Sequence, residues 1–265
     1  MAPNRNAIRT TRADRTQLAG LEFSRLSEAG VVQHIIEQLA VGEGGWALPA
    51  NVDVCRQVQR DQAVHALVEN ADLIVPDGMP LVWGARLKAQ PVAERVAGSA
   101  LIFSLSAAAG EAGRSIYLLG GAAGIPDAAG RELTSRYPNL KLAGTDSPPF
   151  GFEKSETEMA QIRDRLLQAA PDIVYVGLGF PKQERLIAEL APKFPATWFI
   201  SCGAAIPFAA GTLSRAPVWM QKSGLEWFFR LLSEPRRLFR RYLVDDLPYA
   251  ATLLVSCATY RINSR

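Results

Sequence analysis

Cysteine and histidine are scarce in this chain of 265 residues. Its three cysteines, Cys55, Cys202 and Cys257, are widely separated and form no CxxC pair, and there are only two histidines. A disulfide framework needs paired cysteines and a zinc site needs clustered ligands, so neither is indicated. The sequence therefore predicts a protein of a reducing compartment that binds no metal.

Long apolar runs are also lacking. The nearest candidate for a membrane span, Leu247–Tyr260, has fourteen residues without a charge, which is too short to cross a bilayer. Such a segment suits a helix that lies at a membrane surface or packs on the core. The first twenty residues are basic and polar with no apolar segment behind them, so they predict a flexible basic tail (residues 1–20) and no signal peptide.

Charge is distributed unevenly along the chain. The net charge is only +3, but from Ser214 to the end nine Lys and Arg residues stand against four Asp and Glu residues. A basic end predicts an anionic partner there, either phosphate groups or a membrane surface, and charge alone leaves nucleic acid open. The hydrophobic share of 48% is enough for a full core, which excludes disorder of the whole chain.

Apolar runs of strand length alternate with segments of helical period. Strands are expected within residues 46–54, 71–78, 114–121, 140–145, 172–179 and 196–203, and helices within residues 27–39, 54–69, 126–137 and 156–169. This alternation predicts an α/β fold with a Rossmann-like, mostly parallel sheet flanked by helices. A helical, basic C-terminal appendage follows the sheet.

Two glycine-containing turns follow predicted strands. Gly120 and Gly121 lie between a strand and a helix, where backbone N–H groups can receive a pyrophosphate, although GxGxxG spacing is absent and a tight turn could need the same glycines. Gly179 precedes Gln183 and Glu184 at the end of another strand, where open α/β sheets bind ligands. Helix capping is the alternative for that second group. These five residues are the candidates for donor binding.

Polar residues at two further strand ends form the catalytic hypothesis. Asp77 closes one strand in VPDG, and Asn51 stands at the end of the strand before it. Adjacent parallel strands would bring this amide and this carboxylate into one crevice, where Arg95 could supply a positive charge for phosphate. Asp77 alone would most often be a turn residue.

Arginines of the C-terminal segment are candidates for binding a diphosphate. Arg230, Arg237 and Arg240 are separated by seven and three residues, which places them near one face of a continuous helix. Pro235 interrupts that helix and starts a second one, so the shared face holds best for Arg237, Arg240 and Arg241. An ordinary basic surface is the alternative interpretation.

The chain resembles the WecG/TagA/CpsF family of glycosyltransferases from about Leu21 to Leu247. The likeness rests on the order and spacing of ADLIVPDGMPLVWGARL, ERVAG, YLLGG, VGLGFPKQE, AAGTLSRAP and GLEWFFRLLSEPRRLFRRYL. It implies an inverting, metal-independent transferase without a cofactor. Such an enzyme moves a sugar from a UDP-sugar to a polyprenyl-diphosphate-linked saccharide in cell-surface or exopolysaccharide synthesis.

The resemblance also implies roles for single residues. Asp77 matches the family's proposed base, and the residues that match its other active-site, nucleotide and lipid-diphosphate positions are Asn51, Arg95, Gln183, Glu184, Arg230, Arg237 and Arg240. Two departures concern the site. Pro49 stands where the family often has threonine, and Ile206-Pro207 stands where it often has Phe-Asp.

The expected organisation is an α/β catalytic domain (residues 21–213) and a membrane-docking appendage (residues 214–265), peripheral at the cytoplasmic face of the inner membrane. Two other functions are weighed. A nucleotide-dependent oxidoreductase or epimerase would need GxGxxG and an acidic residue closing the next strand. A basic nucleic-acid-binding module would need exposed aromatic residues for base stacking. No nucleic-acid partner is expected, and the sequence leaves a homo-oligomer open.

Overall fold

The computed structural model describes residues 14–263, apart from the side chains of Val218, Gln221, Lys222 and Asn263. A six-stranded parallel sheet in the order β4-β3-β8-β7-β5-β6 forms its centre, and β1 and β2 make a separate antiparallel pair. The strands are β1 (Arg15–Leu18), β2 (Leu21–Ser24), β3 (Gly45–Ala50), β4 (Leu73–Pro76), β5 (Ser115–Gly120), β6 (Lys141–Asp146), β7 (Ile173–Gly177) and β8 (Trp198–Ser201). The prediction of a parallel α/β sheet is confirmed.

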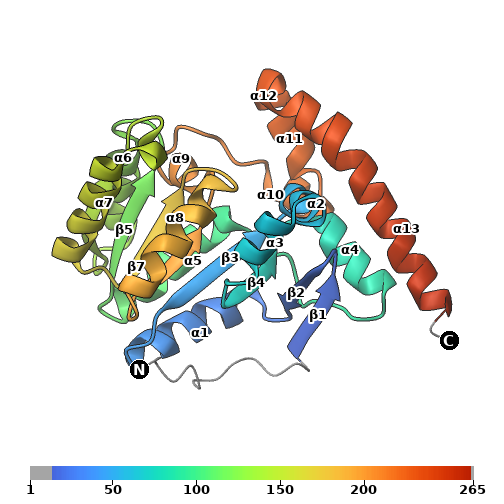
Figure 1. Cartoon of the computed structure of the whole chain (residues 1–265), viewed down its shortest axis with the longest axis horizontal. Coiled ribbons are helices and arrows are strands. Elements are labelled where there is room, and N and C mark those ends of the chain that lie inside the picture. Colours follow the sequence, from blue (N-terminus) through green and yellow to red (C-terminus); the bar gives the residue numbers. More distant parts are fainter. Residues whose placement is uncertain (1–13, 264–265) are drawn as a thin grey trace.

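Helices connect the strands and form the C-terminal part of the chain (Figure 1). The helices of the α/β body are α1 (Glu28–Ala40), α2 (Val52–Arg60), α3 (Gln62–Val68), α4 (Met79–Leu87), α5 (Gly98–Glu111), α6 (Ile125–Arg136), η2 (Phe152–Lys154), α7 (Glu156–Ala169), α8 (Lys182–Leu190), η3 (Ala191–Lys193) and α9 (Ala205–Ala209). Those of the appendage are α10 (Val218–Ser223), α11 (Glu226–Ser233), α12 (Pro235–Phe239), the π-helix η4 (Arg240–Asp246) and α13 (Leu247–Asn263).

Apolar side chains cover both faces of the sheet, because successive residues of a strand point to opposite sides. Leu48 of β3 packs in the layer formed with α2, α3, α4, α7 and α8, whereas its neighbour Ala47 packs in the layer formed with α1, α5, α6 and α9. A sheet buried on both faces explains the nearly continuous apolar strands of the sequence. It also leaves the carboxyl ends of the strands as the place where polar side chains can gather.

The N-terminal prediction needs a correction. Residues 1–13 of the predicted tail lie outside the described residues, but Arg15–Leu18 form β1 and pair with β2. Leu18 and Thr16 are buried, and the Thr16 hydroxyl donates to the carbonyl oxygen of Gln90. The boundary at residue 20 is therefore wrong, because alternating residues of this segment pack on the body.

The predicted helix over residues 54–69 divides into α2 and α3. Asp61 lies between them, and its carboxylate accepts hydrogen bonds from the N–H groups of Ala63 and Val64. An aspartate that caps a helix start satisfies N–H groups that otherwise lack partners. This division positions α2, which begins directly after Asn51.

The appendage lies beside the β4 edge of the sheet, on the side away from α6 and α7 (Figure 1). Helix α13 packs against α4, and its residues Leu253 and Cys257 belong to the apolar core of the body. Within residues 14–263, no helix combines the length and the apolar character needed to cross a membrane. The predicted boundary between residues 213 and 214 stays a prediction.

Candidate active site

A cavity of about 590 Å³ opens at the carboxyl ends of β3, β4, β7 and β8. Its size falls within the range of about 300–1,000 Å³ that is typical of small-molecule sites. The body contributes residues that follow these four strands, and the appendage contributes residues of α11, α12 and η4. Both parts of the chain are therefore needed to form the wall of this cavity.

Asp77 follows β4 directly and lines this cavity. Its backbone N–H donates to the carbonyl oxygen of Ala50 at 2.8 Å, which ties the ends of β4 and β3 together. Its Oδ2 accepts from the N–H of Gly98, the first residue of α5, at 3.4 Å. Burial raises the pKa of the Asp77 carboxyl, the charge of Arg95 opposes that rise, and the charge of Glu226 adds to it.

Arg95 and Glu226 form an ion pair between the body and the appendage. Nη1 of Arg95 donates to Oε2 of Glu226 at 2.6 Å, and both side chains are largely buried. Both residues line the cavity together with Asp77. The appendage thus places a second carboxylate beside the arginine that faces Asp77.

Asn51 also lines the cavity, as the sequence predicts. Its Oδ1 accepts from the N–H of Val54 at 3.1 Å and caps the start of α2. This oxygen serves the helix cap, while the Nδ2 group has no hydrogen-bond role in the cap and is a donor. Asn51 therefore suits an acceptor atom such as a hydroxyl or phosphate oxygen.

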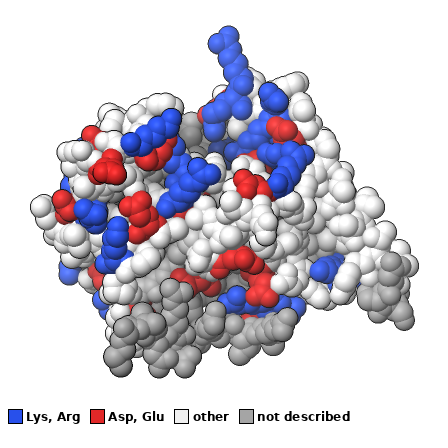
Figure 2. Space-filling model, in the orientation of Figure 1, with Lys and Arg blue, Asp and Glu red and all other residues white. Residues whose placement is uncertain are grey.

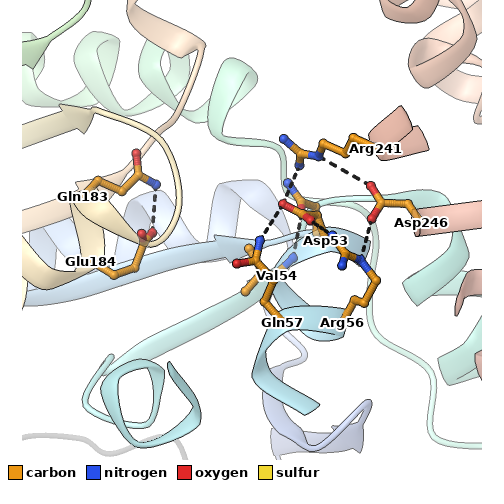
Figure 3. A network of polar contacts seen from close by, with 9 residues as sticks. Asp53, Val54, Arg56, Gln57, Gln183, Glu184, Arg241 and Asp246 are labelled. Carbon is orange, nitrogen blue, oxygen red and sulfur yellow. Dashed lines mark hydrogen bonds and ion pairs between the residues drawn. The ribbon is translucent and has the colours of Figure 1, made fainter. Parts of the chain in front are cut away.

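Gln183 and Glu184 also line the cavity, and both are buried at the start of α8 (Figure 3). Oε1 of Gln183 accepts from the backbone N–H groups of Leu178, Gly179 and Gly203, at 3.2–3.3 Å, so it ties together the loops after β7 and β8. Its Nε2 donates to Oε1 of Glu184 at 2.8 Å. Burial raises the pKa of Glu184 to about 7, and the hydrogen bond from Gln183 opposes that rise.

Gly120 and Gly121 are not among the residues that line the cavity, whereas Gly179 is. Gly120 ends β5 next to Gly177 of β7, and a Cβ atom at Gly120 would stand 2.5 Å from the carbonyl oxygen of Gly177. The φ of Gly120 is +117°, a conformation that favours glycine. Close approach of two strands thus accounts for this glycine without a ligand.

The appendage brings three arginines to the cavity: Arg230, Arg237 and Arg241. The guanidinium of Arg230 lies over the ring of Phe208, and that of Arg237 forms two hydrogen bonds with the carboxylate of Glu234. Arg240 is exposed and is not among the lining residues. The structure therefore puts Arg241, and not the expected Arg240, at this wall.

Arg241 belongs to a cluster of charges that joins α2 to η4 (Figure 3). Asp53 and Arg56 come from α2, and Arg241 and Asp246 come from η4. Burial raises the pKa of Asp246, and the charge of Asp53 adds to that rise. Within residues 14–263, no group of three or more His, Cys, Asp and Glu side chains has the arrangement of a metal site.

Sequence reasoning misses Asp53, Glu226 and Asp246 as lining residues, and it names Arg241 only as a neighbour of Arg237 and Arg240 on one helix face. Glu226 lies in the segment GLEW, which is part of the family resemblance, but the resemblance assigns no role to this residue. Asp246 has no local signal for its contact with Arg56, which is 190 residues away, and Asp53 has none for its contact with Arg241. Both prolines that mark departures from the family pattern, Pro49 and Pro207, line the cavity.

Comparison with known proteins decides the family. The model of the Glycosyl transferase WecG/TagA/CpsF family matches residues 16–263. The chain belongs to this family of glycosyltransferases. As a family member it is 29% identical to the N-acetylglucosaminyldiphosphoundecaprenol N-acetyl-beta-D-mannosaminyltransferase of Bacillus subtilis (strain 168), over 84% of this chain and 82% of that protein. It is 28% identical to the enzyme of the same name from Staphylococcus aureus (strain MW2), over 85% of this chain and 87% of that protein.

Proposed function

We propose that this glycosyltransferase moves a sugar from a UDP-sugar to a polyprenyl-diphosphate-linked saccharide, with inversion and without a metal. The observation that carries the proposal is the shared cavity, in which Asp77 and Arg95 of the body face arginines of the appendage. A carboxylate next to a concentration of guanidinium groups suits a reaction that needs a base and releases a diphosphate. The acceptor class is taken from the relatives, whose names specify a diphosphoundecaprenol-linked N-acetylglucosamine.

The mechanism assigns the proton to Asp77. Its carboxylate removes the proton of the acceptor hydroxyl while that oxygen attacks the anomeric carbon, and the bond from this carbon to the UDP oxygen breaks in the same displacement. Attack from the face opposite to UDP inverts the configuration. The raised pKa of Asp77 makes it a stronger base than an exposed aspartate, at the cost of protonation at a higher pH.

The departing UDP carries the negative charge that forms in the reaction. The charge of Arg95 acts on Asp77 more strongly than that of Arg230, and Arg95 is held in the cavity lining by its ion pair with Glu226. Guanidinium groups bind diphosphate through paired N–H donors, so Arg95 stabilises the leaving group. Arg230 and Arg237 would hold the diphosphate of the acceptor at the appendage side of the same cavity.

The appendage also presents a surface suited to a membrane. Trp219, Leu232, Phe239, Val255 and Ile262 are exposed, with 65% of Leu232 and 57% of Phe239 accessible. Figure 2 shows Lys and Arg side chains gathered over α11 and α12, while the visible surface along α13 is mostly uncharged. Apolar side chains beside basic groups favour peripheral attachment to an anionic leaflet, here the cytoplasmic face of the inner membrane, where the lipid-linked acceptor is presented.

The test of this proposal is Asp77→Asn, with UDP-N-acetylmannosamine and N-acetylglucosaminyldiphosphoundecaprenol as substrates. Turnover should fall by about 10²-fold or more while UDP binding is kept, because the amide cannot accept the proton. Asp61→Asn is the matched control, because Asp61 caps α3 away from the cavity and asparagine caps helices equally well. Turnover by Asp77→Asn at the level of this control would reject the mechanism.

A further inference from the structure

The appendage is joined to the body by an alternating cluster of four charges, in which Asp53 and Asp246 are buried and Arg56 and Arg241 are partly buried. Arg56 donates to Oδ1 of Asp246 at 3.1 Å and also bonds Asp53. Nη2 of Arg241 lies 3.2 Å from Oδ2 of Asp53, and its Nε lies 3.5 Å from Oδ2 of Asp246. Each carboxylate therefore faces one arginine of its own segment and one of the other segment.

Stability alone is a weak explanation for this cluster. Asp53 and Asp246 are only 6% and 8% exposed, and removing charges from water costs free energy that their mutual attraction often does no more than offset. Apolar residues could join two helices at least as firmly. What paired buried charges add is a single permitted geometry, because any displacement leaves a charge without its partner.

The backbone of η4 is wound so that it can make these contacts. The N–H of Leu247 donates to the carbonyl oxygen of Tyr242, five residues earlier, which is the π-helical pattern. Arg241 and Asp246 are also five residues apart. In an α-helix they would point about 140° apart, whereas a π-helical turn brings residues five apart to the same side. The unusual winding thus directs both side chains at α2.

The cluster forms part of the cavity wall. Asp53, Arg241 and Asp246 all line the cavity, and Asp53 lies two residues after Asn51 on the same helix. The side chain of Arg241 is 35% exposed, against 8% for that of Asp53. Of these two lining residues, Arg241 therefore has the more accessible side chain, and Asp53 lies deeper.

We propose that Asp53 is a positioning residue, which fastens the appendage to α2 and holds the Arg241 guanidinium at the cavity wall for the diphosphate of the acceptor. The fastening depends only on the contacts described above. The ligand of Arg241 rests on the proposed function. Two measurements on the full-length protein separate these parts.

The first measurement is hydrogen–deuterium exchange of the backbone amides in α12 and η4. Asp53→Asn should raise their exchange rates by roughly tenfold or more, because loss of one partner in a buried charge pair favours local opening. Arg241→Gln should do the same, and the double variant should add little to either single change because the two residues act as one unit. Asp53→Glu should restore slow exchange in part.

The matched control is Arg114→Gln, which removes an arginine–aspartate pair of similar length (3.1 Å) between Arg114 and Asp172 in the body. It should leave exchange in α12 and η4 unchanged. Unchanged exchange in both Asp53→Asn and Arg241→Gln would overturn the fastening role. Effects that multiply in the double variant would also overturn it. Arg241→Gln keeps the test decisive if Asp53→Asn fails to fold.

The second measurement is steady-state kinetics with the two substrates named for the Asp77 test. Asp53→Asn and Arg241→Gln should each raise KM for the lipid acceptor by roughly tenfold and leave KM for the donor within about twofold. A merely structural defect would lower the active fraction and leave both KM values unchanged. An unchanged acceptor KM would remove Arg241 from acceptor binding, and this outcome is distinct from failure of the Asp77 test.

Discussion

The α/β body and the C-terminal appendage bury their side chains in different ways. Two continuous apolar layers enclose the sheet, and residues such as Trp46, Tyr175 and Phe199 are almost entirely inaccessible. In α11 and α12, by contrast, buried Leu231 and Leu238 lie among exposed aromatic and aliphatic residues. The body is held by its own core, whereas the appendage depends on its junctions with the body and leaves apolar surface for another partner.

Ion pairs join the appendage to the body at the wall of the cavity. These pairs fix the position of the appendage, whereas apolar packing keeps the body folded. Arg95–Glu226 and the cluster around Asp53 stand on two parts of one cavity wall, while Leu253 and Cys257 of α13 add apolar contact outside it. Removing one partner of a buried charge pair leaves the other charge uncompensated, so these junctions are sensitive to single substitutions. The comparison predicts that changes at the ionic junctions alter catalysis more than they alter the stability of the body.

The largest effect in this comparison is expected from Glu226→Gln. Turnover should fall by roughly 10–100-fold, because Arg95 loses the partner that orients it. The acid limb of the pH–rate profile should also move to lower pH, because the charge of Glu226 helps to raise the pKa of Asp77. The melting temperature of the body should change little. A large loss of stability with an unmoved acid limb would show that Glu226 serves the fold instead.

A moderate effect is expected from Leu232→Glu together with Phe239→Glu in the appendage. Co-flotation with vesicles that contain anionic lipid should fall by roughly tenfold, because two exposed apolar groups are replaced by charges that the leaflet repels. Leu167→Glu in α7, at a similarly exposed apolar position of the body, is the control and should float as the unaltered protein does. Equal loss in the control would contradict a membrane face confined to the appendage.

The last effect concerns Glu184, which belongs to the body alone and should leave the junction with the appendage unchanged. Its pKa of about 7 in the folded protein exceeds that of an unfolded glutamate, so the unfolded state ionises first as pH rises. As pH rises from about 4.5 to about 7, ionisation of Glu184 therefore lowers the free energy of unfolding by an amount on the order of 3 kcal/mol. Glu184→Gln should remove this decline.

The decline is measured by urea denaturation at several pH values. Glu189→Gln, on the exposed side of the same helix, should keep it. If Glu184→Gln leaves the pH dependence as it is in the unaltered protein, the buried carboxyl does not titrate in this range.

The strands and the convergence of Asn51, Asp77 and Arg95 could be predicted because their signals are local. Apolar runs mark the strands, and parallel strands share one carboxyl edge. Their chemical roles stay predictions until tested by substitution. The pairing of Asp53 with Arg241 has no such signal, because contacts between distant segments do not alter the pattern of either segment.

Arg240 shows how a break between two helices misplaces a residue. Helical offsets of seven and three from Arg230 assume one continuous helix, but Glu234 has φ −133° and ψ 57° and separates α11 from α12. The relation between Arg230 and the arginines after Pro235 therefore depends on this break, which the spacing alone does not describe. Gly120 is a residue whose sequence context suggests phosphate binding but whose cause is structural. A side chain at this position would clash with the carbonyl oxygen of Gly177.

The shared wall of the cavity has a consequence for the rate of the reaction cycle. Residues of both the body and the appendage line the cavity, so loosening of their junction would widen the route by which substrate enters and product leaves. We expect substitutions that tighten this junction to hold substrate for longer and to release product more slowly. Under the proposed role of Arg241, the strength of the Asp53–Arg241 contact then balances capture of the acceptor against release of the product.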